Sequence, residues 1–203
     1  MRLKNKIAVI TGAGSGFGKG IAIRFAEEGA KVVIADINLV SAEKVAAEIG
    51  KNALAIAGDV SQDGDVSSMF ERTVKHYGRV DILINNAGTT HRNKPMTEVT
   101  EEEFEQIFAV NVKSVFLTAK HGVPLMKKQG NGVILNVAST AGLRPRPGLV
   151  WYNTSKGAMI TATKAMAIEL ATFKIRVNAI NPVAGETGMI AFTRILNVAN
   201  SIA

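Results

Sequence analysis

Tyr152 and Lys156 are the residues whose types and spacing point most directly to chemistry. Their separation of four residues places both side chains on one face of a helix. A free tyrosine titrates near ~10 and is a poor base at neutral pH, whereas an adjacent lysine ammonium favours the phenolate through its opposite charge. Ser139 follows a predicted strand at the same end of the fold, where its hydroxyl can bond a substrate oxygen. This set favours proton transfer to or from a small molecule.

A glycine-rich turn at residues 11–18, Thr-Gly-Ala-Gly-Ser-Gly-Phe-Gly, lies between a predicted strand and a predicted helix. Glycine allows positive φ and lets backbone N–H groups approach a pyrophosphate at a helix N-terminus. The turn is not a nucleoside triphosphate P-loop, which would require glycine and a hydroxyl residue where the chain has Ala13 and Gly20. The context predicts a dinucleotide site that includes Gly12, Ser15, Gly16, Phe17 and Gly18.

Asp36 ends the second predicted strand, twenty residues beyond Gly16. A carboxylate at this position can accept hydrogen bonds from both ribose hydroxyls of an adenosine. It would repel a 2′-phosphate, and no basic residue follows it directly. The pattern therefore favours NAD, with NADP the less favoured cofactor. Asp59 and Val60, after the third strand, are candidates for contacts with the adenine edge.

The elements that must position these residues alternate along the chain. We expect strands at 6–10, 31–35, 53–57, 80–84, 133–137 and 175–180, and helices at 17–28, 39–49, 63–77, 100–128 and 152–171. Alternating strands and helices imply right-handed crossovers and a parallel sheet with both faces covered. We predict an α/β fold, a single Rossmann-like doubly wound domain over residues 1–203, with strand order 3-2-1-4-5-6. Ligands of such sheets lie at the carboxyl ends of the strands.

Taken in order, these motifs resemble the short-chain dehydrogenase/reductase family, and its sugar and alcohol dehydrogenase members in particular. The resemblance runs from about residue 5 to residue 189. It rests on the glycine-rich turn, Asn85-Asn86-Ala87-Gly88 after the fourth strand, Asn111 in the long helix, Ser139, and Tyr152-x-x-x-Lys156.

The resemblance implies a catalytic group of Asn111, Ser139, Tyr152 and Lys156. Tyr152 would take the alcohol proton while hydride passes to the nicotinamide. Lys156 would hold the nicotinamide ribose and lower the pKa of Tyr152, Ser139 would orient the reacting oxygen, and Asn111 would hold a water that connects Lys156 to solvent.

The resemblance also implies further cofactor contacts. Asn86, Ala87 and Gly88 would border the adenosine ribose. After the sixth strand, Pro182 and Val183 would line the cofactor site and Thr187 would reach the carboxamide. The family usually carries glycine where this chain has Val183.

The chain departs from the family pattern at its C-terminal end. The family continues into a substrate lid, a further helix and a seventh strand, whereas this chain stops at Ala203. We therefore expect the seventh strand to be missing and residues 189–203 to be a remnant of the substrate lobe. The family resemblance also implies a homodimer or homotetramer built on helices 100–128 and 152–171.

The expected substrate is a small alcohol or ketone, such as a sugar or a hydroxy acid. Four basic residues lie in or near the predicted substrate loops at 89–95 and 140–151, and they are candidates for attracting an anionic substrate: His91, Arg92, Arg144 and Arg146. No cluster of histidines and carboxylates has metal-ligand spacing, so we expect no metal.

Composition excludes several other classes. With 47% hydrophobic residues, the chain is not intrinsically disordered. It contains no cysteine, which excludes disulfides and thiolate metal sites and is consistent with a cytoplasmic protein. We expect no membrane segment, because no apolar stretch approaches ~20 residues. The charge of +7 is spread along the chain without a basic block, which argues against nucleic-acid binding.

Two alternatives to an enzyme remain open. One is a regulatory protein that binds a dinucleotide on the same fold without turnover, because a fold does not determine function. The other is a nucleic-acid-binding protein, which the positive charge would favour if affinity fell steeply with salt.

Overall fold

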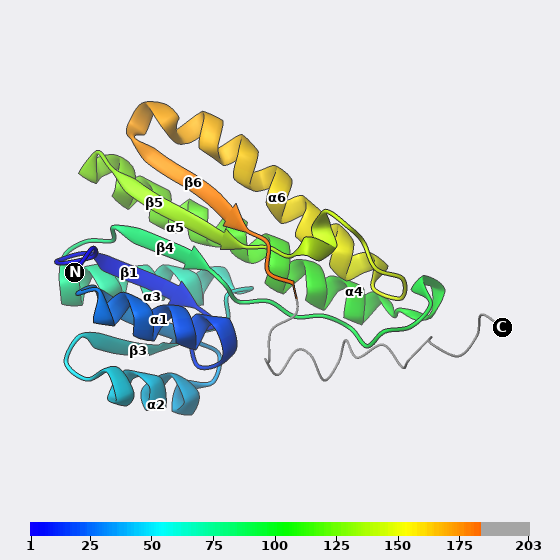
Figure 1. Cartoon of the computed structure of the whole chain (residues 1–203), viewed down its shortest axis with the longest axis horizontal. Helices are drawn as coiled ribbons and strands as arrows, with labels where there is room; N and C mark the ends of the chain where they lie inside the picture. Colours follow the sequence, from blue (N-terminus) through cyan, green and yellow to red (C-terminus); the bar gives the residue numbers. More distant parts are fainter. Residues whose placement is uncertain (184–203) are drawn as a thin grey trace.

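A six-stranded parallel sheet organises the protein (Figure 1). The computed structural model describes residues 1–183. The strands are β1 (Ile7–Thr11), β2 (Lys31–Asp36), β3 (Ala53–Ala57), β4 (Ile82–Asn85), β5 (Gly132–Val137) and β6 (Ile175–Ile180). Their order is β3-β2-β1-β4-β5-β6, and every neighbouring pair is parallel. The predicted Rossmann-like α/β fold and its strand order are confirmed.

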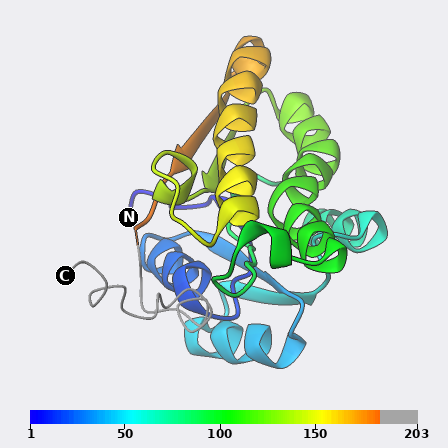
Figure 2. The ribbon, with the colours of Figure 1, turned by 90° about the vertical axis from the view of Figure 1, so that its right-hand side faces the viewer.

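Helices cover both faces of this sheet, as the continuously apolar strands require (Figures 1 and 2). The principal helices are α1 (Gly16–Glu27), α2 (Leu39–Ile49), α3 (Asp63–Tyr77), α4 (Glu101–Phe108), α5 (Ser114–Gln129) and α6 (Val150–Leu170). The strands present alternate residues to two cores. One core joins the sheet to α1 and α2, and the other joins it to α3, α5 and the end of α6.

A chain of buried polar groups ties α6 to the sheet. Thr118 of α5 donates to Asn85 of β4, and Asn85 donates to Asn136 of β5. Asn136 donates in turn to Thr163 of α6, each bond being 2.8 Å long. Because these buried groups meet one another's hydrogen-bonding needs inside the core, this series of hydrogen bonds holds α6 in one register against the ends of β4 and β5.

The single helix predicted over residues 100–128 differs in one respect. It begins as expected, because Thr100 caps the helix and forms a capping box with Glu103. Between α4 and α5, however, residues Ala109–Lys113 form a π-helical turn. The chain winds continuously through this turn, and hydrophobic periodicity cannot reveal the extra residue that widens it.

The fourth strand also begins later than predicted, at Ile82 rather than at residue 80. The N–H and C=O groups of Val80 bond the side-chain amide of Gln129, and this replaces strand pairing at that residue.

Among residues 1–183, no helix has the length and apolar character needed to span a bilayer. Residues 189–203, predicted to be a remnant of the substrate lobe, lie outside the described residues, and so does Thr187.

Candidate active site

A cavity of about 670 Å³ lies at the carboxyl ends of the strands, where the fold was expected to bind its ligand. Its volume lies in the range of about 300–1,000 Å³ that is usual for small-molecule and cofactor sites. Most of the predicted site residues that the structure describes line it: Gly12, Ser15, Gly16, Phe17, Asp36, Asp59, Val60, Asn86, Ala87, Gly88, Ser139, Tyr152, Lys156, Pro182 and Val183. Gly18 and Asn111 do not line it.

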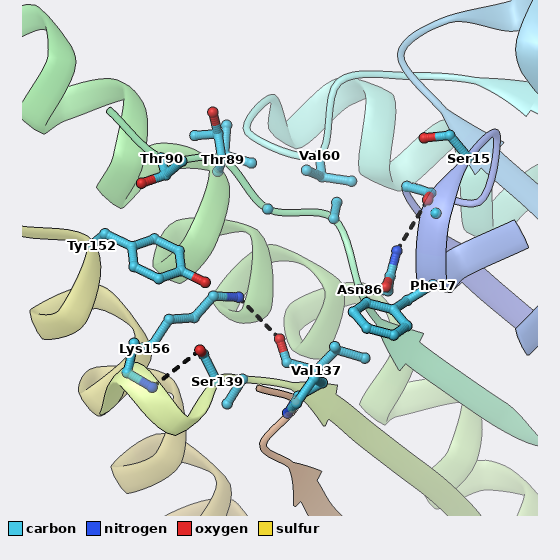
Figure 3. A pocket seen from close by; sticks show the side chains of 18 of the residues that line it. Ser15, Phe17, Val60, Asn86, Thr89, Thr90, Val137, Ser139, Tyr152 and Lys156 are labelled. Carbon is cyan, nitrogen blue, oxygen red and sulfur yellow. Dashed lines mark hydrogen bonds between the residues drawn. The ribbon is translucent and has the colours of Figure 1, made fainter. Parts of the chain in front are cut away.

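Three of the four predicted catalytic side chains converge on this cavity (Figure 3). Tyr152 and Lys156 come from the first turns of α6, and Ser139 follows β5. The Lys156 ammonium lies 5.9 Å from the centre of the Tyr152 ring and donates to the main-chain oxygen of Val137 at 3.0 Å. The Ser139 hydroxyl accepts a hydrogen bond from the N–H of Ala141, which leaves its proton free for another acceptor.

Burial dominates the electrostatics of the pair. It lowers the pKa of Lys156 to about 8, because the charged form loses solvation. Burial also raises the pKa of the Tyr152 phenol, while the neighbouring Ser139 hydroxyl and the positive charge of Arg146 act in the opposite direction. The Lys156 ammonium bonds the Val137 oxygen, and the lowering of the Tyr152 pKa by Lys156, which the resemblance implied, stays a prediction.

Asn111 lies in the π-helical turn, completely buried, behind the cavity wall. Its side-chain N–H groups donate to the Thr89 oxygen and to the Ser155 hydroxyl, both at 2.9 Å. Its side-chain oxygen accepts from the N–H of Thr89 at 2.8 Å. Asn111 therefore fixes the segment after β4 against α6, and its amide has no donor left for a water.

The glycine-rich turn has the geometry of an anion site. Gly12 and Gly16 have positive φ values of 61° and 53°. The Ser15 side chain makes no capping bond at the start of α1, and the first turn of α1 contains no acidic residue. The N–H groups at this helix end therefore remain available to a negative group in the cavity.

Gly18 packs against the glycine-rich turn on the side away from the cavity. A Cβ at this position would overlap the Gly12 oxygen and lie 2.5 Å from the Asn86 side-chain nitrogen. Its missing side chain lets α1 pack directly on the turn, which explains why Gly18 is needed without contacting the cavity.

The turn is clamped to the end of β4. The Asn86 side chain donates to the main-chain oxygens of Thr11 and Gly12, at 2.9 and 3.0 Å. The Thr11 hydroxyl accepts from the N–H groups of Asn86 and Ala87. These bonds join the ends of β1 and β4, the two neighbouring strands between which the strand order of the sheet reverses direction.

The two cavity carboxylates sit at the ends of β2 and β3. Asp36 accepts from the N–H groups of Gly14 and Asn38, both at 2.9 Å. Asp59 accepts from the N–H and the hydroxyl of Ser61. Each carboxylate is oriented by the protein and keeps lone pairs for a ligand hydroxyl or amine.

Several lining residues were not predicted individually from the sequence. Thr89, Thr90, Ala141 and Leu149 lie within or beside the loops expected to meet substrate, so the sequence indicated the region but not these contacts. Gln106 and Val110 come from the long helix, and only the tertiary structure brings them to the cavity.

Of the four basic residues considered for anion binding, only Arg146 lines the cavity. His91 is buried, whereas Arg92 and Arg144 are exposed, and none of these three is part of the lining. Within the described part of the chain, no group of three or more histidines and carboxylates is placed to hold a metal ion.

Comparison with known proteins agrees with this geometry. Residues 6–195 match the family described as short chain dehydrogenase. A 4-formylbenzenesulfonate dehydrogenase of Comamonas testosteroni is 47% identical over 194 residues, which cover 94% of this chain and 77% of that protein.

Solved structures superpose closely. A 3-ketoacyl-(acyl-carrier-protein) reductase from Brucella melitensis complexed with NADH has a TM-score of 0.93 and 52% identity, over 94% of this chain and 80% of that one. An NAD⁺-bound xylitol dehydrogenase has a TM-score of 0.87 and 34% identity, over 90% and 72% of the two chains. With its fold, its cavity and these matches in agreement, the chain belongs to the short-chain dehydrogenase family of nicotinamide dinucleotide oxidoreductases.

Proposed function

We propose that this protein is an NAD-dependent oxidoreductase that transfers a hydride between the nicotinamide and a secondary alcohol or ketone, with Tyr152 as the acid/base. The observation that carries the proposal is the meeting of Tyr152, Ser139 and Lys156 at one cavity. The Ser139 hydroxyl follows β5, and the Tyr152 phenol and the Lys156 ammonium come from the first turns of α6. Together these three groups can bind a substrate oxygen and transfer its proton.

The residues at the other end of the cavity fit a dinucleotide. The uncapped start of α1 and the positive-φ glycines suit a pyrophosphate, and Asp36 suits the hydroxyls of the adenosine ribose. Exposed Ile37 follows Asp36 and also lines the cavity, so a 2′-phosphate would meet a carboxylate and an apolar side chain. This environment supports NAD rather than NADP. When bound, the cofactor accepts or supplies the hydride.

Side chains of the protein transfer the proton of the substrate hydroxyl. In alcohol oxidation, Ser139 donates a hydrogen bond that orients the substrate oxygen, and the Tyr152 phenolate takes the hydroxyl proton. In ketone reduction, the phenol returns that proton to the new alkoxide. Lys156 supplies positive charge beside the phenolate, and Asn111 holds the wall that contains Thr89.

A proton relay through Asn111 would have to use an oxygen of that residue as acceptor. Both N–H groups of its amide are bonded to protein, so a water could only donate to it. This restricts the role that the resemblance implied for Asn111.

A substrate screen tests the function directly. The purified protein with NAD⁺ or NADH is offered alcohols, sugars, hydroxy acids, aldehydes and oxo esters, and the absorbance of NADH is followed. The relatives' names span an aromatic aldehyde sulfonate, a ketoacyl thioester and a sugar alcohol, so all three classes belong in the panel. Turnover of at least one alcohol or carbonyl compound is expected.

The second candidate is a dinucleotide-binding regulatory protein without turnover. The glycine-rich turn and Asp36 would suffice for it. NADH binding with no turnover on any member of the panel would favour this reading.

A further inference from the structure

Arg146 is the basic residue of the predicted substrate loops that the fold brings to the reacting end of the cavity. It lines the same cavity as Tyr152, and its positive charge opposes the rise in the Tyr152 pKa that burial causes. The other three basic residues in or near these loops do not line the cavity. Of the four candidates for binding an anionic substrate, the tertiary structure therefore brings only Arg146 to the cavity.

The backbone that carries Arg146 is held in place. Proline stands on both sides of it, at positions 145 and 147, and restricts the backbone there. Its main-chain oxygen accepts from the Asn153 side chain at 2.8 Å, one residue beyond Tyr152. The Asn93 side chain donates to the Pro147 oxygen at 3.0 Å. The guanidinium is therefore presented by an anchored loop.

Within residues 1–183, no carboxylate neutralises the charge of Arg146, because none lies within salt-bridge distance of it. The two acidic residues of the described cavity lining are Asp36, the last residue of β2, and Asp59, two residues after β3, and both accept hydrogen bonds from protein N–H groups there. Thr89, Thr90 and Gln106 add neutral polar groups to the lining.

A partly buried, unneutralised guanidinium is suited to a planar oxyanion, which it can bind with two parallel hydrogen bonds. We propose that Arg146 is the specificity residue for a substrate that carries a carboxylate or a chemically similar oxyanion near the reacting carbon. The inference rests on the proposed function and names the substrate class of the same site.

The test compares matched acids and esters. Acetoacetate and formylbenzoate are each offered beside their uncharged methyl esters, and kcat/KM is measured for both members of each pair. We expect the unmodified protein to prefer the acid. Arg146→Gln should reduce the ratio of acid to ester about 10- to 100-fold, the range expected for loss of a hydrogen-bonded charge pair. Arg146→Lys should restore part of the ratio.

Arg144→Gln is the matched control, because it removes an arginine two residues away that is exposed and outside the lining. It should leave the ratio unchanged. An equal loss of preference in Arg144→Gln and Arg146→Gln, or no loss in Arg146→Gln, would overturn the proposal. Each variant is first titrated with NADH to show that it is folded and binds the cofactor.

A binding measurement separates this proposal from the proposed function. Each carboxylate is added to the protein–NADH complex, and the Tm is recorded for the unmodified protein and for Arg146→Gln. A rise in Tm that Arg146→Gln abolishes supports anion binding by Arg146, even where no probe is turned over; absent turnover then counts against the oxidoreductase alone. If neither carboxylate raises the Tm, and kcat/KM for each ester equals that for its acid, the proposal for Arg146 is wrong.

Discussion

The Lys156 ammonium donates a hydrogen bond to the main-chain oxygen of Val137 across 3.0 Å, which joins α6 to the last residue of β5. Only 3% of Lys156 is exposed, and within the described residues no carboxylate forms a salt bridge with it. A carbonyl dipole compensates an ammonium less well than water does, so burial lowers the pKa of Lys156 to about 8. The site therefore holds its cation at a cost in stability.

That cost predicts how stability depends on pH. The pKa of Lys156 is about 8 in the folded protein against 10.5 for the unfolded reference. Between these values the unfolded chain binds a proton that the folded protein has released, so the free energy of unfolding rises with pH. The penalty is fully present below about pH 8, where the shift corresponds to about 3 kcal/mol.

Lys156→Met should therefore stabilise the protein at pH 7 while it abolishes function. The substitution removes the buried charge, and the increase in stability between pH 8 and 10.5 should disappear with it. Turnover should fall further than in a Tyr152 variant, because ribose binding and the positive charge are both lost. Urea unfolding across this pH range, beside an NADH titration, measures both effects. A variant less stable than the unmodified protein at pH 7 would show that the hydrogen bond outweighs the desolvation.

Tyr152→Phe tests the acid/base assignment. It removes one oxygen from a side chain that is almost completely buried and should leave the packing of α6 intact. General acid–base catalysis is typically worth 10²–10⁴-fold, so turnover should fall at least about a hundredfold while NADH binds normally. Steady-state kinetics and NADH fluorescence provide the two readouts. Full turnover in this variant would assign the proton transfer to another residue.

Asp36 should determine the choice between NAD and NADP. Asp36→Ala removes the carboxylate that would repel a 2′-phosphate, and Ile37→Arg adds a cation beside it, so each should shift kcat/KM toward NADP. Since Asp36 also accepts the N–H bonds of Gly14 and Asn38, Asp36→Ala should weaken NADH binding as well. Ile37→Arg leaves those bonds in place and is the cleaner variant. Equal kcat/KM for both cofactors in the unmodified protein would contradict the assignment.

Gly18 and Gly20 form a matched pair on α1. Gly18→Ala places a methyl group against the Gly12 oxygen and the Asn86 side chain, so it should distort the turn and abolish NADH binding. Gly20→Ala meets no atom within 4 Å and should stabilise the protein by about 0.5–1 kcal/mol, the usual gain in a helix interior. Thermal unfolding and NADH titration of both variants check the contrast. Normal binding by Gly18→Ala would show that the close packing of α1 on the turn is dispensable.

The protein should form at least a dimer through α5 and α6. Phe116 on α5 is 63% exposed and Ile168 on α6 is 80% exposed, and both helices lie on the sheet face opposite α1 and α2. Replacing both residues with glutamate should shift the protein toward the monomer, because charge is unfavourable in an interface core. Analytical ultracentrifugation at micromolar concentration measures the change. A monomer in the unmodified protein would refute the expectation.

The sequence by itself determined the fold class and the end of the sheet that carries the cavity. Short, β-branched apolar runs bounded by turn residues indicate strands covered on both faces, and their alternation with amphipathic helices predicts a doubly wound sheet whose strand ends meet at one edge. The glycine-rich turn and Asp36 were predictable for the same reason, because each follows a strand directly. Tyr152 and Lys156 share a helix face through local geometry alone.

The tertiary structure decided what depends on packing between distant segments. The π-helical turn at Asn111 and its bonds to Thr89 and Ser155 have no periodic signal, and the polar chain from Thr118 to Thr163 joins four elements. Burial of Lys156 beside the Val137 oxygen, which lowers its pKa, cannot be read from spacing. The same holds for Arg146, because only the folded loop separates the one arginine that lines the cavity from its neighbour Arg144, which faces solvent. Hydrophobic pattern and turn chemistry act over a few residues, whereas desolvation and charge proximity depend on the whole fold.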